Sequence, residues 1–357
     1  MSYEARYAGS TVADLEETRH ALRERLDIFL EEVQPALRVD IVQVLAGTGK
    51  LLCRPASLLD GRWALLPLYL ACDLLPEVNM NFAGTVALAL ECVICSTDLL
   101  DDAMDGDMTP PIQQLGVARS LNVSLALMCL AQRMLLSLSE LAVPAALPLR
   151  LLETLQRSLL LASAGQQRDL LAEGRAACEL TWEECIEIAA GKAGALLSLA
   201  CQLGALCAGA SGSCVEQCAE LGRLLGIAAQ LDNDAHDLSR LLQLASAEPL
   251  EHQKSDLARS KKTLPVVLAA RSLHATLAWH EPRIDSAFRN LALLVEEERT
   301  TCLSALREGI LATWGIALLY RERARDCLRE IEHGGPLSQR LLLVLGLQKE
   351  HFTDKER

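Results

Sequence analysis

Apolar residues recur at helical spacing along most of the chain. Between residues 12 and 32, Leu15, Leu22 and Leu26 follow one another at intervals of seven and four, with charged residues between them. This periodicity predicts an amphipathic helix. Residues 84–100 and 221–231 are apolar nearly throughout, which predicts buried helices. Because we find no sustained alternation of apolar and polar residues, the pattern predicts an all-α fold.

Turn-forming residues divide this pattern into separate helices. Gly61, Gly174 and the pair Pro110–Pro111 lie between apolar segments, and Thr181 with Glu184 has the spacing of a capping box. Neither a repeat nor a low-complexity linker divides the chain. We therefore expect one domain over residues 1–357, with flexible ends at about residues 1–10 and 350–357.

Composition narrows the class of protein. Hydrophobic residues make up 51% and charged residues 23%, which excludes disorder over most of the chain. The mean hydropathy of +0.20 is high. However, polar residues interrupt segment 115–138, and segment 196–210 is shorter than the roughly 20 residues of a membrane span. We therefore expect no transmembrane segment.

Charge and cysteine content bear on partners and location. Thirty-four Lys and Arg against 47 Asp and Glu give a net charge of −13, which argues against nucleic-acid binding. The 13 cysteines are odd in number, and the polar first 17 residues do not resemble a secretion signal. A reduced, cytoplasmic protein is expected.

Two acidic clusters end apolar helices. Asp98, Asp101 and Asp105 share one face of a predicted helix, and Asp102 is adjacent. The second cluster contains Gln230, Asn233, Asp234, His236 and Asp237. Carboxylates at a helix C-terminus oppose the helix dipole, so stability does not explain them. Mg²⁺ would neutralise them and also bind substrate phosphates, whereas a solvated acidic helix end is the simpler alternative.

These residues resemble the motifs of the trans-isoprenyl diphosphate synthases and of the terpene synthases built on the same fold. Residues 101–105 match DDxxD, with Glu91 ten residues earlier, and residues 226–237 resemble GxxxQxxDDxxD. Further matches are residues 165–170 to GQxxDL, 191–194 to GKTG, 255–265 to DLxxxKxTLP, and 49–55 to GGKRxRP with one extra residue between Lys and Arg. The matches occur in the family's order along the chain.

The resemblance implies a class I isoprenoid synthase, a bundle of helices around a central cavity, that forms a homodimer. A prenyl diphosphate would be held by about three Mg²⁺ ions and ionised to an allylic cation. The implied metal ligands are Asp101, Asp102, Asp105, Asn233, Asp234 and Asp237, with Asp102 more distant, and Asp101, Asp105, Asp234 and Asp237 are the implied catalytic residues. The implied diphosphate contacts are Lys192, Lys261, Gln230, Gln166, Lys50 and Arg54.

The cavity wall would include residues just before the first motif. Candidates are Phe82, Val93, the small Ser96 and Thr97, and Asp98. Small side chains here favour a substrate of about fifteen carbons or more. Asp98 could be a further ligand or could simply be solvated.

Departures from the family pattern concern the second substrate of elongating members, isopentenyl diphosphate. The family's His seven residues before DDxxD is Ile94 here, and residues 108–115 contain no basic residue where the family has Arg-Arg-Gly. Lys50 and Arg54 remain, whereas a diphosphate needs several cations or bidentate Arg. We therefore expect a terpene synthase that cyclises or quenches the cation from one prenyl diphosphate.

Three alternatives stay open. The protein could be a chain-elongating prenyl diphosphate synthase with a rearranged pocket, or a prenyltransferase acting on a peptide. An aromatic content of only 3% counts against a cyclase, whose cavity commonly uses aromatic faces to stabilise cations. A non-catalytic partner subunit is disfavoured because the aspartates of both motifs are present.

Overall fold

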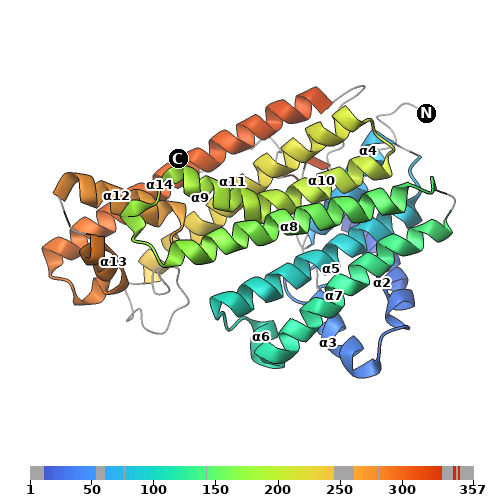
Figure 1. The fold of residues 1–357 in the computed structure, drawn as a ribbon, viewed down its shortest axis with the longest axis horizontal. Coiled ribbons are helices and arrows are strands. Elements are labelled where there is room, and N and C mark those ends of the chain that lie inside the picture. The colour runs from blue at the N-terminus through green and yellow to red at the C-terminus, as the bar shows by residue number, and fades with distance from the viewer. Residues whose placement is uncertain are drawn as a thin grey trace. The chain divides into compact units, whose positions relative to one another are not determined.

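The computed structural model describes residues 12–53, 61–75, 77–141, 143–244, 261–277, 279, 281–331, 341–342 and 345. Within these ranges every regular element is helical, which confirms the all-α prediction (Figure 1). The expected flexible ends, residues 1–10 and 350–357, lie outside the described residues. So do Arg54 and residues 255–257.

The chain forms two compact units. The first comprises residues 1–156, 199–219 and 328–357, and the second comprises residues 157–198 and 220–327. The chain passes between the units more than once, so neither is a continuous stretch of sequence. A single domain over residues 1–357 stays a prediction.

The first half of the chain forms helices that pack around one buried helix. They are α2 (Val12–Leu30), α3 (Pro35–Leu45), α4 (Arg62–Leu74), α5 (Met80–Asp105), α6 (Pro110–Leu115), α7 (Val117–Ser137) and the short η1 (Leu138–Glu140). Helix α5 packs against α4 and α7, and lies beside α7 in Figure 1. Asn79 caps its start by accepting hydrogen bonds from the backbone N–H groups of Asn81 and Phe82.

The second half begins with α8 (Leu147–Glu173), η2 (Ala177–Glu179) and α9 (Trp182–Ala189). A π-helical turn, η3 (Ala190–Gly194), leads into α10 (Ala195–Cys207). Then follow α11 (Gly212–Leu244), α12 (Leu264–Leu277), α13 (Glu281–Arg289), η5 (Leu291–Leu293) and α14 (Glu296–Ile331). The predicted capping box at Thr181 and Glu184 starts α9, with both of its hydrogen bonds formed.

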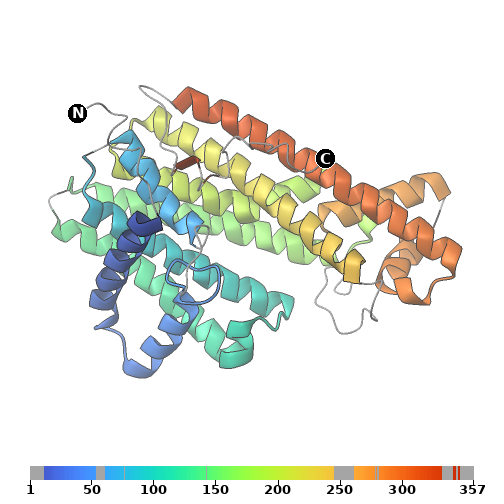
Figure 2. The ribbon, with the colours of Figure 1, turned by 180° about the vertical axis from the view of Figure 1, so that it is seen from behind.

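Buried apolar side chains of α11, α12, α13 and α14 form a common core. It includes Leu238, Val266, Phe288 and Leu306. Helices α11 and α14 run side by side in both views (Figures 1 and 2). This packing explains the apolar run at residues 221–231, whose Ile227 and Leu231 are fully buried.

Four described helical segments are long and apolar enough to cross a membrane. They are Met80–Asp105, Val117–Glu140, Trp182–Cys207 and Glu296–Ile331. By length and composition alone these helices could cross a membrane, whereas segments 115–138 and 196–210 did not suggest this in the sequence. In the first segment, 78% of the apolar window is buried inside the protein, so its side chains build the core. The expected lack of a transmembrane segment stays a prediction.

Candidate active site

The first aspartate motif occupies the last turns of α5. Asp101, Asp102 and Asp105 are half-buried, and Gly106 ends the helix in a left-handed conformation with φ 69°. The hydroxyl of Thr109, just before α6, donates a hydrogen bond to Asp102 Oδ2. Asp102 is therefore held toward the following turn, and its lesser role as a metal ligand stays a prediction.

A tightly held loop brings Lys50 to α5. The Leu51 N–H donates to Glu91 Oε1 over 2.6 Å, and Lys50 Nζ forms an ion pair with Asp98 Oδ2. Burial lowers the pKa of Lys50, but the charges of Asp98, Cys95 and Glu91 and the hydrogen bond to Asp98 together outweigh burial, so the net shift is upward. Lys50 is thus a protonated cation beside the first motif.

Glu91 is a buried carboxyl group on the same helix, with 1% of its surface exposed. Burial raises its pKa to about 7, although Lys50 and the Leu51 N–H favour the charged form. Its position ten residues before the motif was visible in the sequence, but its contact with the Lys50 loop was not. We therefore assign Glu91 a structural role in holding that loop.

Two glutamines that follow the first motif make local polar contacts. Gln113 Nε2 donates to the Met108 carbonyl over 2.6 Å, and Gln114 accepts a hydrogen bond from Gln43 of α3. Ile94 is half-buried on α5. Gln113 and Gln114 thus connect α6 to its surroundings.

The second aspartate motif lies on α11 and presents two sets of side chains. Gln230 Nε2 donates to Asp234 Oδ1 over 2.9 Å, while Asn233 and Asp237 are exposed. On another side, Asp232 forms an ion pair with Arg321 of α14, and the ring of His236 lies edge-on to Trp314. The contact of His236 fits a structural role, and Gln230 is placed to orient Asp234.

Lys192 lies in the π-helical turn and forms an ion pair with Asp169 of α8, with 2.7 Å between Nζ and Oδ2. The Lys192 side chain is 15% exposed and the Asp169 side chain is 16% exposed. Burial and the charges of Asp234 and other nearby carboxylates, Asp169 included, raise the pKa of Cys185 to about 12. Asp234 and Asp169 therefore both lie close enough to Cys185 to affect its charge state. Asp169 was visible as part of the GQxxDL match, but its partner was not.

Glycines allow backbones to touch at the π-helical turn. A Cβ atom on Gly165 of α8 would lie 2.5 Å from the Gly191 carbonyl carbon, and one on Gly226 of α11 would lie 2.4 Å from the Ala193 oxygen. No larger residue fits either position without moving the helices. Gln166 follows Gly165, and its buried Nε2 has no hydrogen-bond partner among the described residues.

Lys261 is half-buried at the start of the segment leading into α12, and its neighbour Lys262 is buried. Lys262 Nζ forms an ion pair with Asp285 over 3.1 Å, and the Lys262 carbonyl accepts a hydrogen bond from Cys185. Lys262 therefore anchors the segment that carries Lys261. Two adjacent lysines in a sequence do not indicate which of them is buried.

The predicted cavity residues on α5 have different surroundings. The Ser96 hydroxyl hydrogen-bonds to Ser124 of α7, so Ser96 faces that helix. The Thr97 hydroxyl donates to backbone carbonyls within α5, and Phe82 and Val93 are buried. Asp98 pairs with Lys50. A cavity wall built by these residues stays a prediction.

Among the described residues, no three His, Cys, Asp or Glu side chains lie close enough together to hold a metal ion. Mg²⁺ uses few protein ligands and keeps water and phosphate oxygens as the others. The oxygen donors of Asp101 and Asp105, one helical turn apart, fit this ion.

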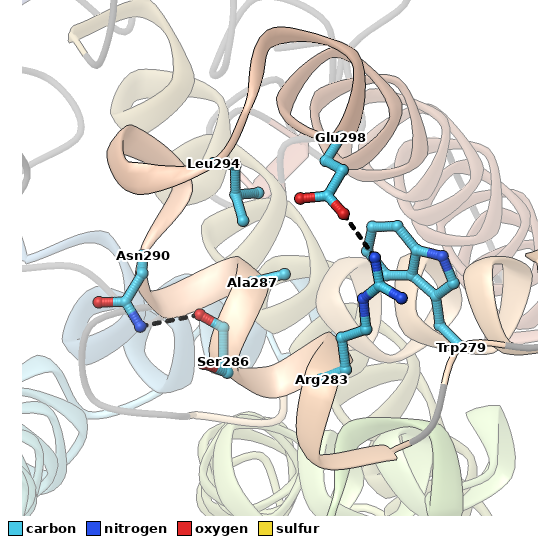
Figure 3. A pocket seen from close by; sticks show the side chains of 7 residues that line it. All are labelled: Trp279, Arg283, Ser286, Ala287, Asn290, Leu294 and Glu298. Carbon is cyan, nitrogen blue, oxygen red and sulfur yellow. Dashed lines mark hydrogen bonds and ion pairs between the residues drawn. The ribbon is translucent and has the colours of Figure 1, made fainter.

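A separate pocket of about 160 Å³ lies among α13, η5 and the start of α14 (Figure 3). The guanidinium of Arg283 lies 4.3 Å from the centre of the Trp279 ring and pairs with Glu298 over 2.5 Å. The side chains lining it belong to Trp279, Arg283, Ser286, Ala287, Asn290, Leu294 and Glu298. No residue of either aspartate motif is among them.

Solved structures define the class of fold. A crystal structure of a geranylgeranyl pyrophosphate synthase superposes with a TM-score of 0.72 at 21% identity, covering 93% of this chain and 98% of that one. A polyprenyl synthetase from Streptomyces coelicolor A3(2) gives 0.69 at 23% identity, covering 94% and 99%. These similarities confirm the all-α class I isoprenoid synthase fold.

The family follows from the sequence match. Residues 39–286 match the family model described as Polyprenyl synthetase, and the chain belongs to that family. This confirms the resemblance to trans-isoprenyl diphosphate synthases.

Two curated relatives are more closely similar in sequence than these structures. Geranylgeranyl diphosphate synthase of Mycobacterium tuberculosis (strain ATCC 25618 / H37Rv) is 35% identical over 204 residues, which cover 54% of each chain. (2E,6E)-farnesyl diphosphate synthase of Mycobacterium bovis (strain ATCC BAA-935 / AF2122/97) is 34% identical over 185 residues, which cover 50% of this chain and 48% of the relative. The chain thus spans about half the length of the curated relatives it matches.

Proposed function

We propose that this protein is a chain-elongating prenyl diphosphate synthase that joins a prenyl diphosphate to isopentenyl diphosphate. The observation that carries the proposal is the match of residues 39–286, which include both aspartate motifs, to the polyprenyl synthetase family. The names of the two curated relatives support elongation. They favour elongation over the cyclising terpene synthase that the sequence motifs predict.

In the proposed reaction the allylic carbon–oxygen bond breaks and a new carbon–carbon bond forms to isopentenyl diphosphate. A proton and diphosphate are released. Asp101 and Asp105 on α5, and Asp234 and Asp237 on α11, are the residues that would hold Mg²⁺. When bound, Mg²⁺ neutralises charge on the departing diphosphate. The number of ions, about three, rests on the family resemblance alone.

The protein's own cations supplement the metal. Lys192 is a diphosphate contact in this proposal, and its ammonium group also forms the ion pair with Asp169. Lys261, in the segment anchored by Lys262, is a second diphosphate contact in this proposal. Gln230 orients Asp234 through its amide.

A terpene synthase is the second candidate, and one observation favours it. Residues 108–115 contain no cation, and Gln113 and Gln114 contact Met108 and Gln43. A protein that uses one prenyl diphosphate needs no second diphosphate site. Loss of that site would equally suit a peptide prenyltransferase.

One experiment separates these functions. Purified protein and Mg²⁺ are incubated with geranyl, farnesyl or geranylgeranyl diphosphate, each with and without isopentenyl diphosphate. A longer prenyl diphosphate formed only with both substrates is the expected product. A hydrocarbon or alcohol from one substrate alone would instead establish a terpene synthase, and no product in any mixture would favour a peptide acceptor or a missing partner subunit. Homodimerisation and a cytoplasmic location are part of the same proposal.

A further inference from the structure

Lys50 is a nearly buried cation whose partner is supplied by the chain itself. Its side chain is 20% exposed, and its Nζ pairs with Asp98 Oδ2, whose side chain is 54% exposed. Asp98 stands one helical turn before Asp101 and is additional to the three aspartates of the first motif. Asp98 has no role in the proposed reaction.

The backbone on both sides of Lys50 is fixed. The Gly49 carbonyl accepts a hydrogen bond from the Gly61 N–H over 2.9 Å, and the Leu51 N–H donates to the buried Glu91. A Cβ atom on Gly61 would lie only 2.3 Å from Leu51 Cα, so the two backbones are in contact. Lys50 is therefore a positioned cation and differs from a mobile surface lysine.

Asp98 makes the contact that an anionic ligand would make. A lysine ammonium binds a phosphate oxygen as a point charge, and a carboxylate oxygen offers it the same kind of contact. Because Asp98 lies on the solvent-exposed side of the pair, a phosphate group can replace it without passing through the core. The phosphate must nevertheless compete with a carboxylate tethered to the same protein.

We propose that Asp98 is an internal counter-ion that occupies Lys50 and lowers its affinity for the diphosphate group of a substrate. Asp98 then determines specificity by weakening the binding of a second, phosphate-bearing substrate. The identity of that substrate as isopentenyl diphosphate rests on the proposed function, whereas competition between Asp98 and diphosphate does not.

The test is calorimetric titration with inorganic diphosphate in the presence of EDTA, so that no divalent cation bridges diphosphate to the aspartates. Asp98→Asn is compared with the natural protein and, in a double-mutant cycle, with Lys50→Met and Lys50→Met/Asp98→Asn. Asp98→Asn is expected to bind diphosphate about fivefold more tightly, in keeping with a partly exposed pair. The gain is expected to vanish in the Lys50→Met background.

Asp27→Asn is the matched control, because it removes the same charge from an exposed position on α2. Equal affinity of Asp98→Asn and the natural protein would overturn the proposal. So would an equal gain in the Lys50→Met background or in Asp27→Asn, because either result would reflect net charge alone. In turnover assays Asp98→Asn should lower the KM for isopentenyl diphosphate about fivefold. If neither protein elongates, the proposed function fails, and the titration still decides the role of Asp98.

Discussion

At the scale of single residues, burial and pairing distinguish side chains that look alike in the sequence. Lys192 and Lys262 both form ion pairs with aspartates, but Lys262 is 5% exposed and anchors a segment, while Lys192 lies in the π-helical turn beside the second motif. Asp232 and Asp234 are two residues apart, yet the first pairs with Arg321 and the second with Gln230. Acidic residues close together in the second motif therefore have different partners, and only some of them are candidate catalytic residues.

Removing a predicted metal ligand tests the site directly. Asp101→Ala and Asp234→Ala are each expected to lower kcat by about a hundredfold or more, because charge on the departing diphosphate would lose its neutralising partner. Steady-state kinetics with saturating Mg²⁺ measures the effect, with Asp27→Ala as the control. Full activity in both variants would refute the assignment of the site.

The pKa of Glu91 gives a prediction about stability and pH. A carboxyl group whose pKa is raised to about 7 binds a proton more tightly in the folded than in the unfolded state. Its contribution to the free energy of unfolding is therefore most favourable below about pH 4.5 and is lost as pH rises through about 7. Glu91→Gln removes this dependence and keeps an acceptor for the Leu51 N–H.

Urea unfolding from pH 4.5 to 8 measures the difference between the two proteins. Relative to Glu91→Gln, the natural protein should lose up to about 3 kcal/mol over this range. A constant difference would mean that Glu91 titrates normally. The pH dependence contributed by other groups cancels in this difference, because both proteins contain those groups.

At the scale of elements, glycines decide how closely helices approach. The contact of Gly165 with Gly191 joins α8 to the π-helical turn, and Gly226 joins α11 to the same turn. A π-helical turn often occurs at a functional site, and here it carries Lys192. Helix packing and the position of the cation are thus parts of one arrangement.

Gly165→Ala is expected to destabilise the protein by about 1–3 kcal/mol, because the added Cβ forces the backbones apart. Gly315→Ala is the control, since a Cβ at this position in α14 meets nothing within 4 Å. That change should stabilise the helix by about 0.5–1 kcal/mol. Thermal unfolding measures both, and a Gly165→Ala protein as stable as the natural one would show that the helices can separate without cost.

At the scale of the whole molecule, exposed leucines bear on assembly. Leu149, Leu160 and Leu171 of α8 stand eleven residues apart on one helical face and are 64%, 72% and 64% exposed. Large exposed apolar side chains on one helical face are candidates for a protein–protein contact. We propose this face of α8 as the contact surface of the predicted homodimer.

Leu160→Glu is therefore expected to convert a dimer into a monomer, because a buried unpaired carboxylate opposes association. Light scattering after size-exclusion chromatography measures the mass. Leu293→Glu, at a residue of η5 that is 83% exposed, is the matched control. A mass unchanged by Leu160→Glu would place the interface elsewhere, and a monomeric natural protein would refute the dimer.

The sequence by itself determined the helical class, the family and the two aspartate faces. The family follows from the order of motifs along the chain. The helical class and the aspartate faces depend on local spacing, because intervals of three and four residues place side chains on one helical face whatever the tertiary structure. The tertiary structure alone decided that Asp98 pairs with Lys50, that Asp169 pairs with Lys192, and that Gly165 touches Gly191. Those partners are far apart in the chain, so only the packing of helices against one another brings their charges and backbones together.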